Sequence, residues 1–506
     1  MATLRDVARR AGVSTMTVSR VVNKSRSVKA DTRARVESAI AQLDFVPSDA
    51  GRLLAQRRRR TRLSVTHSVS GEVMGDSSDR AIVDDDLVLH PAPGRRDLSQ
   101  AASPLSGDTT RTMLRIVRAA QPISRVDLAR RLEVNRSTVS EIVTPLIASG
   151  VLREAAPAEA AHRRGRPPIG LTLRSDLSLF IGVNIGVRRT RVGAATTDGR
   201  ILDEESFDTP SDPSIALKRI NSVVERLRAS MPERSLISIG VGVPGPTDAK
   251  RRELLFAPHL GWRDVPVADA LSIVNERYSN DSGKGVSIIV ENDATAAAIY
   301  EARRRLRART PKEQNNFILV RAGTGIGVGL VLGGEVYRGS GTDSGLLGEF
   351  GHMTIVAGGD LCVCGNRGCW EVYASAACAA SLYSGADLSA AEQMPPRFVE
   401  IVARAHAGEL RAQTTLGRIG EKLGIGIGNV ITGLGISRVV ISGRIVHGWK
   451  FLRKSLEEAV AQTMAGRLSN WSIEPGQPTG AGLGGALEVA IEHYLTELAR
   501  PARAAA

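Results

Sequence analysis

Three of the chain's four cysteines fall within eight consecutive positions, and this spacing constrains the local fold more than any other feature of the sequence. They are Cys362, Cys364 and Cys369, and they lie among glycines and polar residues that favour turns. His352 lies ten residues upstream of the first of them. Because a Cys3His set can close a tetrahedral site on zinc, we predict a structural zinc bound by these four side chains. Three unpaired thiols in a loop are the alternative.

The length of the chain predicts several domains, because 506 residues with 42% hydrophobic composition exceed what one core usually holds. The first residues lack the basic and apolar segments of a signal peptide, and no run of about 18 apolar residues occurs. We therefore expect a soluble, cytoplasmic protein without a membrane partner. Disulfides are rare in that compartment, which favours zinc over disulfide bonds for the cysteines.

The net charge of +14 is concentrated near the N-terminus. Residues 1–60 hold 14 Lys and Arg against 5 Asp and Glu, and residues 106–170 hold 11 against 6, whereas residues 61–105 hold 4 against 7. A merely solvated basic surface would not predict this concentration. Binding of a polyanion with counterion release would, so we expect the N-terminal part to have nucleic acid as its partner.

Residues 3–24 have the pattern of a helix-turn-helix. Thr3 and Ser14 are placed as N-caps, and Gly12 lies in the turn between two short helices. A third amphipathic helix is expected at Ala30–Leu43. Small apolar side chains would form the core: Val7, Ala8, Ala11, Val13, Val18 and Val21. The second helix would then turn four side chains outward: Thr15, Met16, Thr17 and Arg20.

Residues 3–56 resemble the headpiece of the lac repressor family, including its hinge helix. The resemblance implies that Thr15, Met16 and Arg20 read the major groove of DNA and that Leu54 wedges into the minor groove. We assign residues 1–58 to this headpiece. A three-helix core that does not bind DNA is the alternative.

A second small domain is expected at residues 108–174, after a flexible linker at 59–107 that is rich in Ser, Asp, Gly and Pro. It should contain three helices, near residues 112–120, 124–132 and 135–147, of which the last two begin with capping side chains. A hairpin follows, and its tip carries three arginines: Arg163, Arg164 and Arg166. Arginines on a tip rich in Gly and Pro suit insertion into the narrow minor groove.

This second domain resembles the winged helix-turn-helix of the repressors in the ROK family (repressors, open reading frames and kinases). On this resemblance we expect Arg136, Ser137 and Thr138 to be exposed and to contact DNA. A winged helix that contacts another protein is the alternative.

From Leu179 onward, β-rich runs alternate with helical ones. The β-rich runs begin at residues 180, 191 and 236, and further strands are expected at 286–290, 316–321 and 327–332, with helices near 213–230, 294–305 and 416–434. This order predicts a two-lobed α/β body of the actin and hexokinase (ribonuclease-H-like) type at residues 175–500. The fold class is thus multidomain, with two small DNA-binding heads before the body. The motifs of the body resemble the ROK family throughout.

The ROK resemblance implies a sugar site. In the family, the matching side chains contact sugar at five positions: Asn292, Asp293, Glu349, His352 and Glu371. His259 stands where the family often has Asn, so we add it to the predicted sugar-binding set. Two of these side chains, Glu349 and Glu371, also flank the predicted zinc ligands, and a rigid metal loop would hold their carboxylates in place for hydrogen bonds from sugar hydroxyls.

The phosphate-transfer motif of the family is altered. ROK kinases have Asp-x-Gly-Gly-Thr in the first strand turn, where this chain has Asn184-Ile-Gly-Val-Arg188. A glycine-rich loop at 322–329 is kept, and so is Asp293, the general base of the family's kinases, although an aspartate there can also bind sugar without catalysis. We therefore predict no catalytic residue and no enzyme activity.

Together these features suggest a sugar-responsive transcriptional regulator, a repressor of carbohydrate-metabolism genes. Its partners would be operator DNA, a small sugar or sugar-phosphate effector, and a second copy of the chain in a homodimer or larger homo-oligomer. Sugar binding would close the cleft between the lobes and change the spacing of the heads. The alternative is an ATP-dependent ROK sugar kinase that carries DNA-binding domains. A third interpretation, a non-catalytic adaptor, is disfavoured by the basic wing.

Overall fold

The computed structural model describes residues 4–14, 17–18, 21, 30–43, 107–155, 169–271, 285–311, 314–339, 346–385 and 396–500. The chain divides into two compact units, Met1–Arg95 and Arg96–Ala506, which we describe separately. The predicted linker lies outside the described residues except for its last residue, 107. Among the described residues, no helix combines the length and the apolar character needed to cross a membrane.

The first unit contains helices α1 (Leu4–Ala11) and α3 (Ala30–Gln42). The backbone N–H of Thr17 donates to the Ser14 hydroxyl, as expected of an N-cap, and Gly12 takes the positive φ of 65° that a turn after a helix favours. Its small core is the predicted one with two additions from α3: Val7, Ala8, Ala11, Val18, Val21, Val36 and Ala39. Val13 packs against this core and is partly buried.

The second unit begins with a winged-helix domain. Helices α5 (Gly107–Ala120), α6 (Arg125–Leu132) and α7 (Arg136–Ala148) precede a three-stranded antiparallel sheet in the order β1 (Ile123–Ser124), β3 (Gly170–Leu173), β2 (Leu152–Ala155). Ser124 caps α6 by accepting from the Asp127 N–H, as predicted, and its hydroxyl donates to the Asp127 carboxylate. Asn135 is the N-cap residue of α7, but its side chain makes no capping hydrogen bond. Helix α5 starts five residues earlier than predicted.

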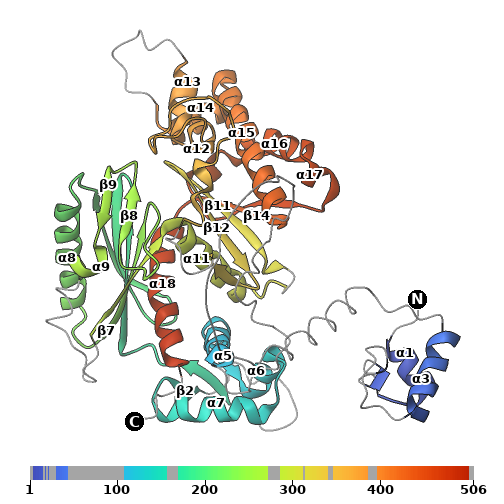
Figure 1. The fold of residues 1–506 in the computed structure, drawn as a ribbon. Helices are drawn as coiled ribbons and strands as arrows, with labels where there is room; N and C mark the ends of the chain where they lie inside the picture. Colours follow the sequence, from blue (N-terminus) through green and yellow to red (C-terminus); the bar gives the residue numbers. More distant parts are fainter. Residues whose placement is uncertain are drawn as a thin grey trace, which may run out of the picture. The chain divides into compact units, whose positions relative to one another are not determined.

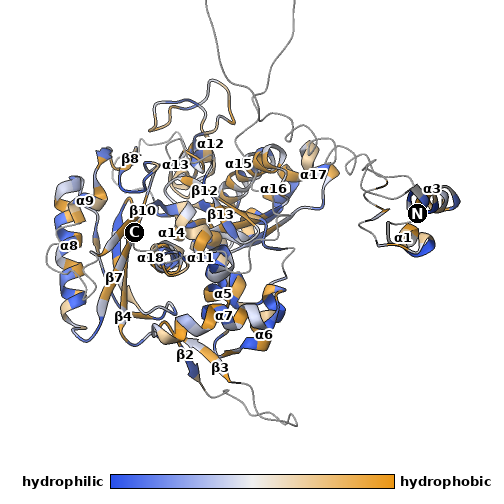
Figure 2. Cartoon of the chain, turned by 60° about the horizontal axis from the view of Figure 1, so that its bottom comes forward, coloured by the Kyte–Doolittle hydropathy of each residue, from blue (hydrophilic) through white to orange (hydrophobic). Residues whose placement is uncertain are grey.

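Lobe 1 of the body is built on a five-stranded sheet in the order β10-β7-β4-β5-β6. Its strands are β4 (Ser178–Ile185), β5 (Arg189–Ala195), β6 (Ile201–Asp208), β7 (Ser235–Val243) and β10 (Ser287–Asn292). Helix α8 (Pro213–Ala229) covers it with one apolar side, and its alternating hydrophilic and hydrophobic residues are visible in Figure 2. A hairpin of β8 (Leu254–Ala257) and β9 (Trp262–Val265) and the short helix α9 (Val267–Leu271) complete the lobe.

Lobe 2 repeats this topology in the order β15-β14-β11-β12-β13. Its strands are β11 (Phe317–Ala322), β12 (Ile326–Leu332), β13 (Glu335–Tyr337), β14 (Arg438–Ser442) and β15 (Ser472–Pro475). In both lobes the first three strands form an antiparallel meander. Two further strands then extend the sheet on the side of the first strand, each parallel to its neighbour. This internal repeat confirms the predicted two-lobed α/β body.

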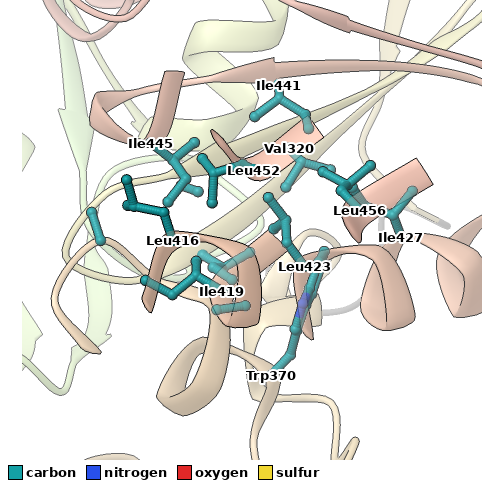
Figure 3. Packing of buried hydrophobic residues seen from close by; sticks show 14 of the residues in the cluster. Val320, Trp370, Leu416, Ile419, Leu423, Ile427, Ile441, Ile445, Leu452 and Leu456 are labelled. Atoms are coloured by element: carbon teal, nitrogen blue, oxygen red, sulfur yellow. The ribbon is translucent and has the colours of Figure 1, made fainter. Parts of the chain in front are cut away.

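The helices of lobe 2 form its core with the sheet. They are α12 (Trp370–Ala374), α13 (Cys378–Ser384), α14 (Phe398–His406), α15 (Leu410–Leu434), α16 (Trp449–Gln462) and α17 (Met464–Leu468), with 3-10 turns η2 (Glu349–His352) and η3 (Arg444–Gly448). Figure 3 shows apolar side chains of α15 at helical spacing, Leu416, Ile419, Leu423 and Ile427, meeting α16 and Trp370. Glycine is required at 426, because a Cβ there would overlap the Trp370 ring.

Helices α11 (Asp293–Arg307) and α18 (Ala481–Leu498) lie between the lobes (Figure 1). Helix α18 crosses the lobe 1 sheet at very short range, since a Cβ at Gly240 of β7 would overlap the Ala486 carbonyl oxygen. Its far end joins the core of the winged-helix domain through Ala490, Ile491 and Leu495. Helix α11 was predicted from the sequence, whereas α18, which contacts both the body and the winged-helix domain, was not.

Candidate functional site

A cavity of about 500 Å³ lies between the two lobes. Lobe 1 contributes the β4–β5 turn, the loop after β7 and the start of α11; lobe 2 contributes the β11–β12 turn, η2, α12 and the residue after β14. The first residues of α18 line it as well. Its charged side chains separate into an acidic end and a basic end, which we describe in turn.

The acidic end is centred on the start of α11. The side-chain oxygen of Asn292 caps the helix by accepting from the N–H groups of Ala294 (2.9 Å) and Thr295 (3.1 Å). Its amide nitrogen then donates to the Gly245 carbonyl and, at 3.1 Å, to Glu349. One capping side chain therefore fixes the helix, the loop after β7 and a carboxylate of η2 relative to one another.

Glu371 holds the other side of the acidic end. Its Oε2 accepts from the backbone N–H of Ile326 at 3.3 Å, and its Oε1 lies 3.3 Å from His259 Nε2 and 3.6 Å from His352 Nδ1. Glu349 lies near the other ring nitrogen of His352, at 3.8 Å. All six predicted sugar-binding side chains thus line one cavity, including His259.

The carboxyl groups of this end differ in acidity. Burial, with the nearby Asp293 and Glu371 charges, raises the pKa of Glu349 to about 8. Burial also raises the pKa of Asp293, against the opposing effect of Arg321. For Glu371, burial is outweighed by the neighbouring His259 and His352, so its pKa is lowered. The site therefore combines a carboxyl group of raised pKa at Glu349 with one of lowered pKa at Glu371, a mixture that suits hydroxyl groups, which both donate and accept.

The predicted zinc ligands converge. One ligand atom from each of His352, Cys362, Cys364 and Cys369 lies within 4.8 Å of all the others. The Cys364 and Cys369 sulfurs are 3.8 Å apart, and His352 Nδ1 is 3.6 Å from Cys362 Sγ. Tetrahedral zinc with Zn–S distances of about 2.3 Å places sulfurs about 3.8 Å apart. The geometry and the donor set therefore fit zinc.

The fold explains why the cluster forms. Gly365 and Gly368 have φ values of 95° and 74°, which reverse the chain between the cysteines, and a Cβ at Gly368 would overlap the Val356 carbonyl oxygen. Cys362 also donates to Glu371 Oε1 at 3.3 Å, so the thiol cluster and the acidic end of the cavity share a boundary. His352 takes part in both the thiol cluster and the acidic end, because its Nδ1 lies near Cys362 and its Nε2 lies near Glu349.

The basic end carries Arg188, Arg321 and Arg444, which we call the arginine cluster. Arg321 pairs with Asp293, and the Arg444 guanidinium donates to the Thr324 hydroxyl at 2.9 Å. The altered phosphate motif also lies here, with the Oδ1 of Asn184 buried and lacking a hydrogen-bond partner. No carboxylate occupies that position, and Asp293, the predicted general base of the kinase alternative, is paired with the Arg321 guanidinium.

The predicted DNA-binding residues are only partly described. Arg136 and Ser137 are exposed on the first turn of α7, as expected. Thr138 is only 8% exposed, so the expectation that it faces outward is wrong; it lies on the apolar side of α7 with Ile142, one turn later. The remaining predicted contacts lie outside the described residues: Thr15, Met16, Arg20, Leu54, Arg163, Arg164 and Arg166.

A buried ion-pair network, which the sequence analysis did not identify, joins the winged helix to the body. Two carboxylates of α18 hold arginines from α5 and α11. Glu488 accepts from Arg118 (3.1 Å) and Arg307 (2.7 Å). Glu492 accepts from Arg115 (2.5 Å) and from Arg303 (3.3 Å). The one local signal was a pair of glutamates four residues apart within an otherwise apolar stretch, a spacing that puts both on one side of a helix.

Comparisons with known proteins agree with this architecture. The model of the ROK family matches residues 180–493, and the model of bacterial regulatory proteins of the lacI family matches residues 3–48. The chain is 29% identical over 389 residues to the xylose repressor of Bacillus subtilis, which covers 76% of this chain and 94% of the repressor. It is 25% identical to the DNA-binding transcriptional dual regulator NagC of Escherichia coli, over 68% of this chain and 82% of NagC.

Solved structures show the same fold. A ROK family transcriptional regulator, described as a homologue of the E. coli MLC protein, superposes with a TM-score of 0.61 at 23% identity and covers 78% of this chain and 98% of its own. A ROK family glucokinase from Streptomyces griseus, in complex with glucose and AMPPNP, superposes with a TM-score of 0.50 at 26% identity over 61% of this chain and 98% of its own. The superposition with the regulator covers more of this chain than the superposition with the glucokinase does.

Proposed function

Because this chain belongs to the ROK family, we propose that it is a sugar-responsive, DNA-binding transcriptional repressor whose effector binds in the cavity between the lobes. The observation that carries the proposal is helix α18, whose first residues line the cavity and whose last turns pack against the winged helix. The similarity to the B. subtilis xylose repressor and to NagC supports the same function. The regulated genes would be those of carbohydrate metabolism.

Effector recognition would use the acidic end of the cavity. Asn292, Asp293 and Glu371 would accept hydrogen bonds from sugar hydroxyls, Glu349 would donate or accept according to pH, and His259 would distinguish between sugars. Zinc bound by the Cys3His cluster would keep His352 and the adjacent carboxylates in place. The metal's role is structural, because four protein ligands leave it no open position.

DNA would be bound by two heads, one in each unit of the chain. Residues 1–58 would form the lac-repressor-type headpiece and residues 108–174 the winged helix, followed by the ROK domain at 175–500. In the winged helix, the exposed Arg136 and Ser137 are placed to reach DNA from the first turn of α7. Two heads on one chain would raise each other's effective concentration at neighbouring sites. A homodimer or larger homo-oligomer would double the number of heads.

We do not propose a kinase. Phosphoryl transfer needs a carboxylate for magnesium and a free general base. Asn184 replaces the carboxylate of the family's kinase motif, and Arg321 pairs with the candidate base Asp293.

The test is binding of the full-length protein to DNA fragments from its own promoter region, titrated with a panel of aldoses. A parallel assay supplies ATP, magnesium and each aldose and measures phosphorylated sugar. Specific DNA binding that one sugar weakens, without phosphate transfer, is the expected result. Sugar phosphorylation would replace the repressor with the kinase alternative, and DNA binding that neither a sugar nor a sugar phosphate changes would refute effector control.

A further inference from the structure

The arginine cluster is an unusual grouping for a cavity wall. Arg188 lies in the β4–β5 turn, Arg321 in β11 and Arg444 at the start of η3, so three separate elements bring three guanidinium groups to one end of the cavity. Like charges repel, and burial together with the charges of Arg188 and Arg321 lowers the pKa of Arg444. Among the described residues, no carboxylate pairs with Arg188 or with Arg444. The cluster therefore carries positive charge that the protein itself does not neutralise.

Other groups at the same end also favour an anion. Helix α18 spans 18 residues, and its N-terminal residues 480–483 line the cavity. Its N-cap is Gly480, which has no side chain to satisfy the first N–H groups of the helix. The Thr324 hydroxyl accepts from Arg444, and the glycines on either side of it, Gly323 and Gly325, also line the cavity. Guanidinium groups, a hydroxyl and a helix N-terminus are the donors that bind phosphate groups.

We propose that this end of the cavity binds the phosphate of a phosphorylated sugar, held by Arg188, Arg321 and Arg444, while the sugar hydroxyls contact the acidic end. The inference rests on the proposed effector site and specifies its ligand class.

The two ends are close enough for one small ligand to reach both. Arg321 touches Asp293 directly. On the other side, Arg444 contacts Thr324, whose neighbour Gly325 lies against the Glu371 carboxylate, since a Cβ at Gly325 would overlap it. The basic and acidic groups therefore adjoin within one cavity, so that a sugar with a phosphate attached can contact both.

A magnesium nucleotide fits the basic end less well. Magnesium bound to phosphates usually also takes one or two carboxylate ligands from the protein. Of the described residues that line the cavity, those with carboxylates are Asp293, Glu349 and Glu371, and all three lie at the acidic end. A phosphomonoester without metal needs only the arginines and backbone donors.

The test is calorimetry on the full-length protein, which measures its affinity for each of a set of ligands. The ligands are glucose, mannose, galactose and xylose, the same sugars with a terminal phosphate, inorganic phosphate, and ATP without magnesium. At least one phosphorylated sugar should bind ten or more times more tightly than its free form. Arg188→Met and Arg444→Met should each weaken that ligand about tenfold, with less than a twofold effect on the free sugar. Arg453→Met removes an exposed guanidinium on α16 that pairs with Glu457 and should change neither affinity.

Equal affinities for free and phosphorylated sugars would overturn the proposal, as would equal loss of both in the arginine variants. Arginine-dependent ATP binding without any advantage for sugar phosphates would overturn the ligand class. The same ligands added to the DNA-binding assay separate this inference from the proposed function. Release of DNA by a free sugar, with no gain from its phosphate, would leave the repressor proposal standing and reject the phosphate subsite.

Discussion

The buried pair between Arg118 of α5 and Glu488 of α18 should control how firmly the winged helix is docked. We choose Glu488→Gln, which keeps the size of the side chain and removes its charge. Arg118 is 6% exposed, and its other hydrogen-bond acceptor is the Thr197 carbonyl, at 2.7 Å. Leaving a buried charge without its partner costs about 3–5 kcal/mol. Since the glutamine oxygen still accepts one hydrogen bond, we expect about 3 kcal/mol, roughly a hundredfold in the docking equilibrium.

Native-state hydrogen exchange on the full chain measures this equilibrium. Amides of α5 that exchange only when the domain undocks should lose about a hundredfold of protection, while amides of the lobe 2 sheet should not change. The matched control is Glu154→Gln, in the same domain, where the glutamate pairs with Arg125 at 2.7 Å but is 41% exposed. Exposed pairs contribute about 0–1 kcal/mol, so its effect should be less than about fivefold.

A loss of α5 protection in Glu488→Gln no larger than that in the Glu154→Gln control would refute the reasoning. The double variant Arg118→Met/Glu488→Leu offers a second check, because replacing both partners with apolar groups avoids the unpaired charge and should restore much of the protection. DNA affinity of Glu488→Gln should be retained while its response to the effector weakens, since an undocked head no longer senses the body.

Three further outcomes are expected. Cys364→Ser should bind less zinc by elemental analysis and lose effector response, whereas Cys378→Ser, which changes a thiol outside the cluster, should keep both. Burial would raise the pKa of Glu492, but Arg303 and Arg115 outweigh it and lower that pKa to about 2. The ionised Glu492 therefore stabilises the fold by about 3 kcal/mol above its ordinary pKa of 4.5, and this stabilisation is lost as the pH falls toward 2. In acid-unfolding curves, the stability difference between wild type and Glu492→Gln should shrink across that pH window. Footprints of a chain starting at Asp108 should be shorter than those of the full chain, and identical footprints would mean that the first head does not bind.

The convergence of the Cys3His cluster could be predicted from the sequence because the information for it is local. Three cysteines in eight positions with glycines between them determine both the ligands and the turns that bring the ligands together. The strands of the body were predictable for the same reason, since buried β-rich runs alternate with helical ones. By contrast, Arg115 meets Glu492 across 377 residues, and no pattern near either residue identifies the other.

Two errors have identifiable physical causes. Thr138 was expected to be exposed on the resemblance to the winged helix-turn-helix, yet it precedes Ile142 by one helical turn and so lies on the buried side. Helix α18 was missed because the glycines at its start are poor helix formers. Those glycines are needed for close approach: a Cβ at Gly482 would lie 2.5 Å from Asn184 Oδ1, and one at Gly485 would lie 2.6 Å from the Ala296 carbonyl. Tertiary packing overrides the local propensity there.

The contacts of α5 suggest how cavity closure would reach the DNA-binding surface. Arg118 bonds to the Thr197 carbonyl of lobe 1, whereas Arg115 pairs with Glu335 of lobe 2, so the same helix is tied to both lobes. A rotation of one lobe against the other cannot leave both contacts unchanged. Glu335 is 45% exposed and Thr197 is buried, so the contact to lobe 2 is the less costly one to break. An effector that binds the closed form only tenfold more tightly gains about 1.4 kcal/mol, comparable to that one exposed contact. We therefore infer that the winged helix moves with lobe 1 and α18, and that the Arg115–Glu335 contact is where closure releases it from lobe 2.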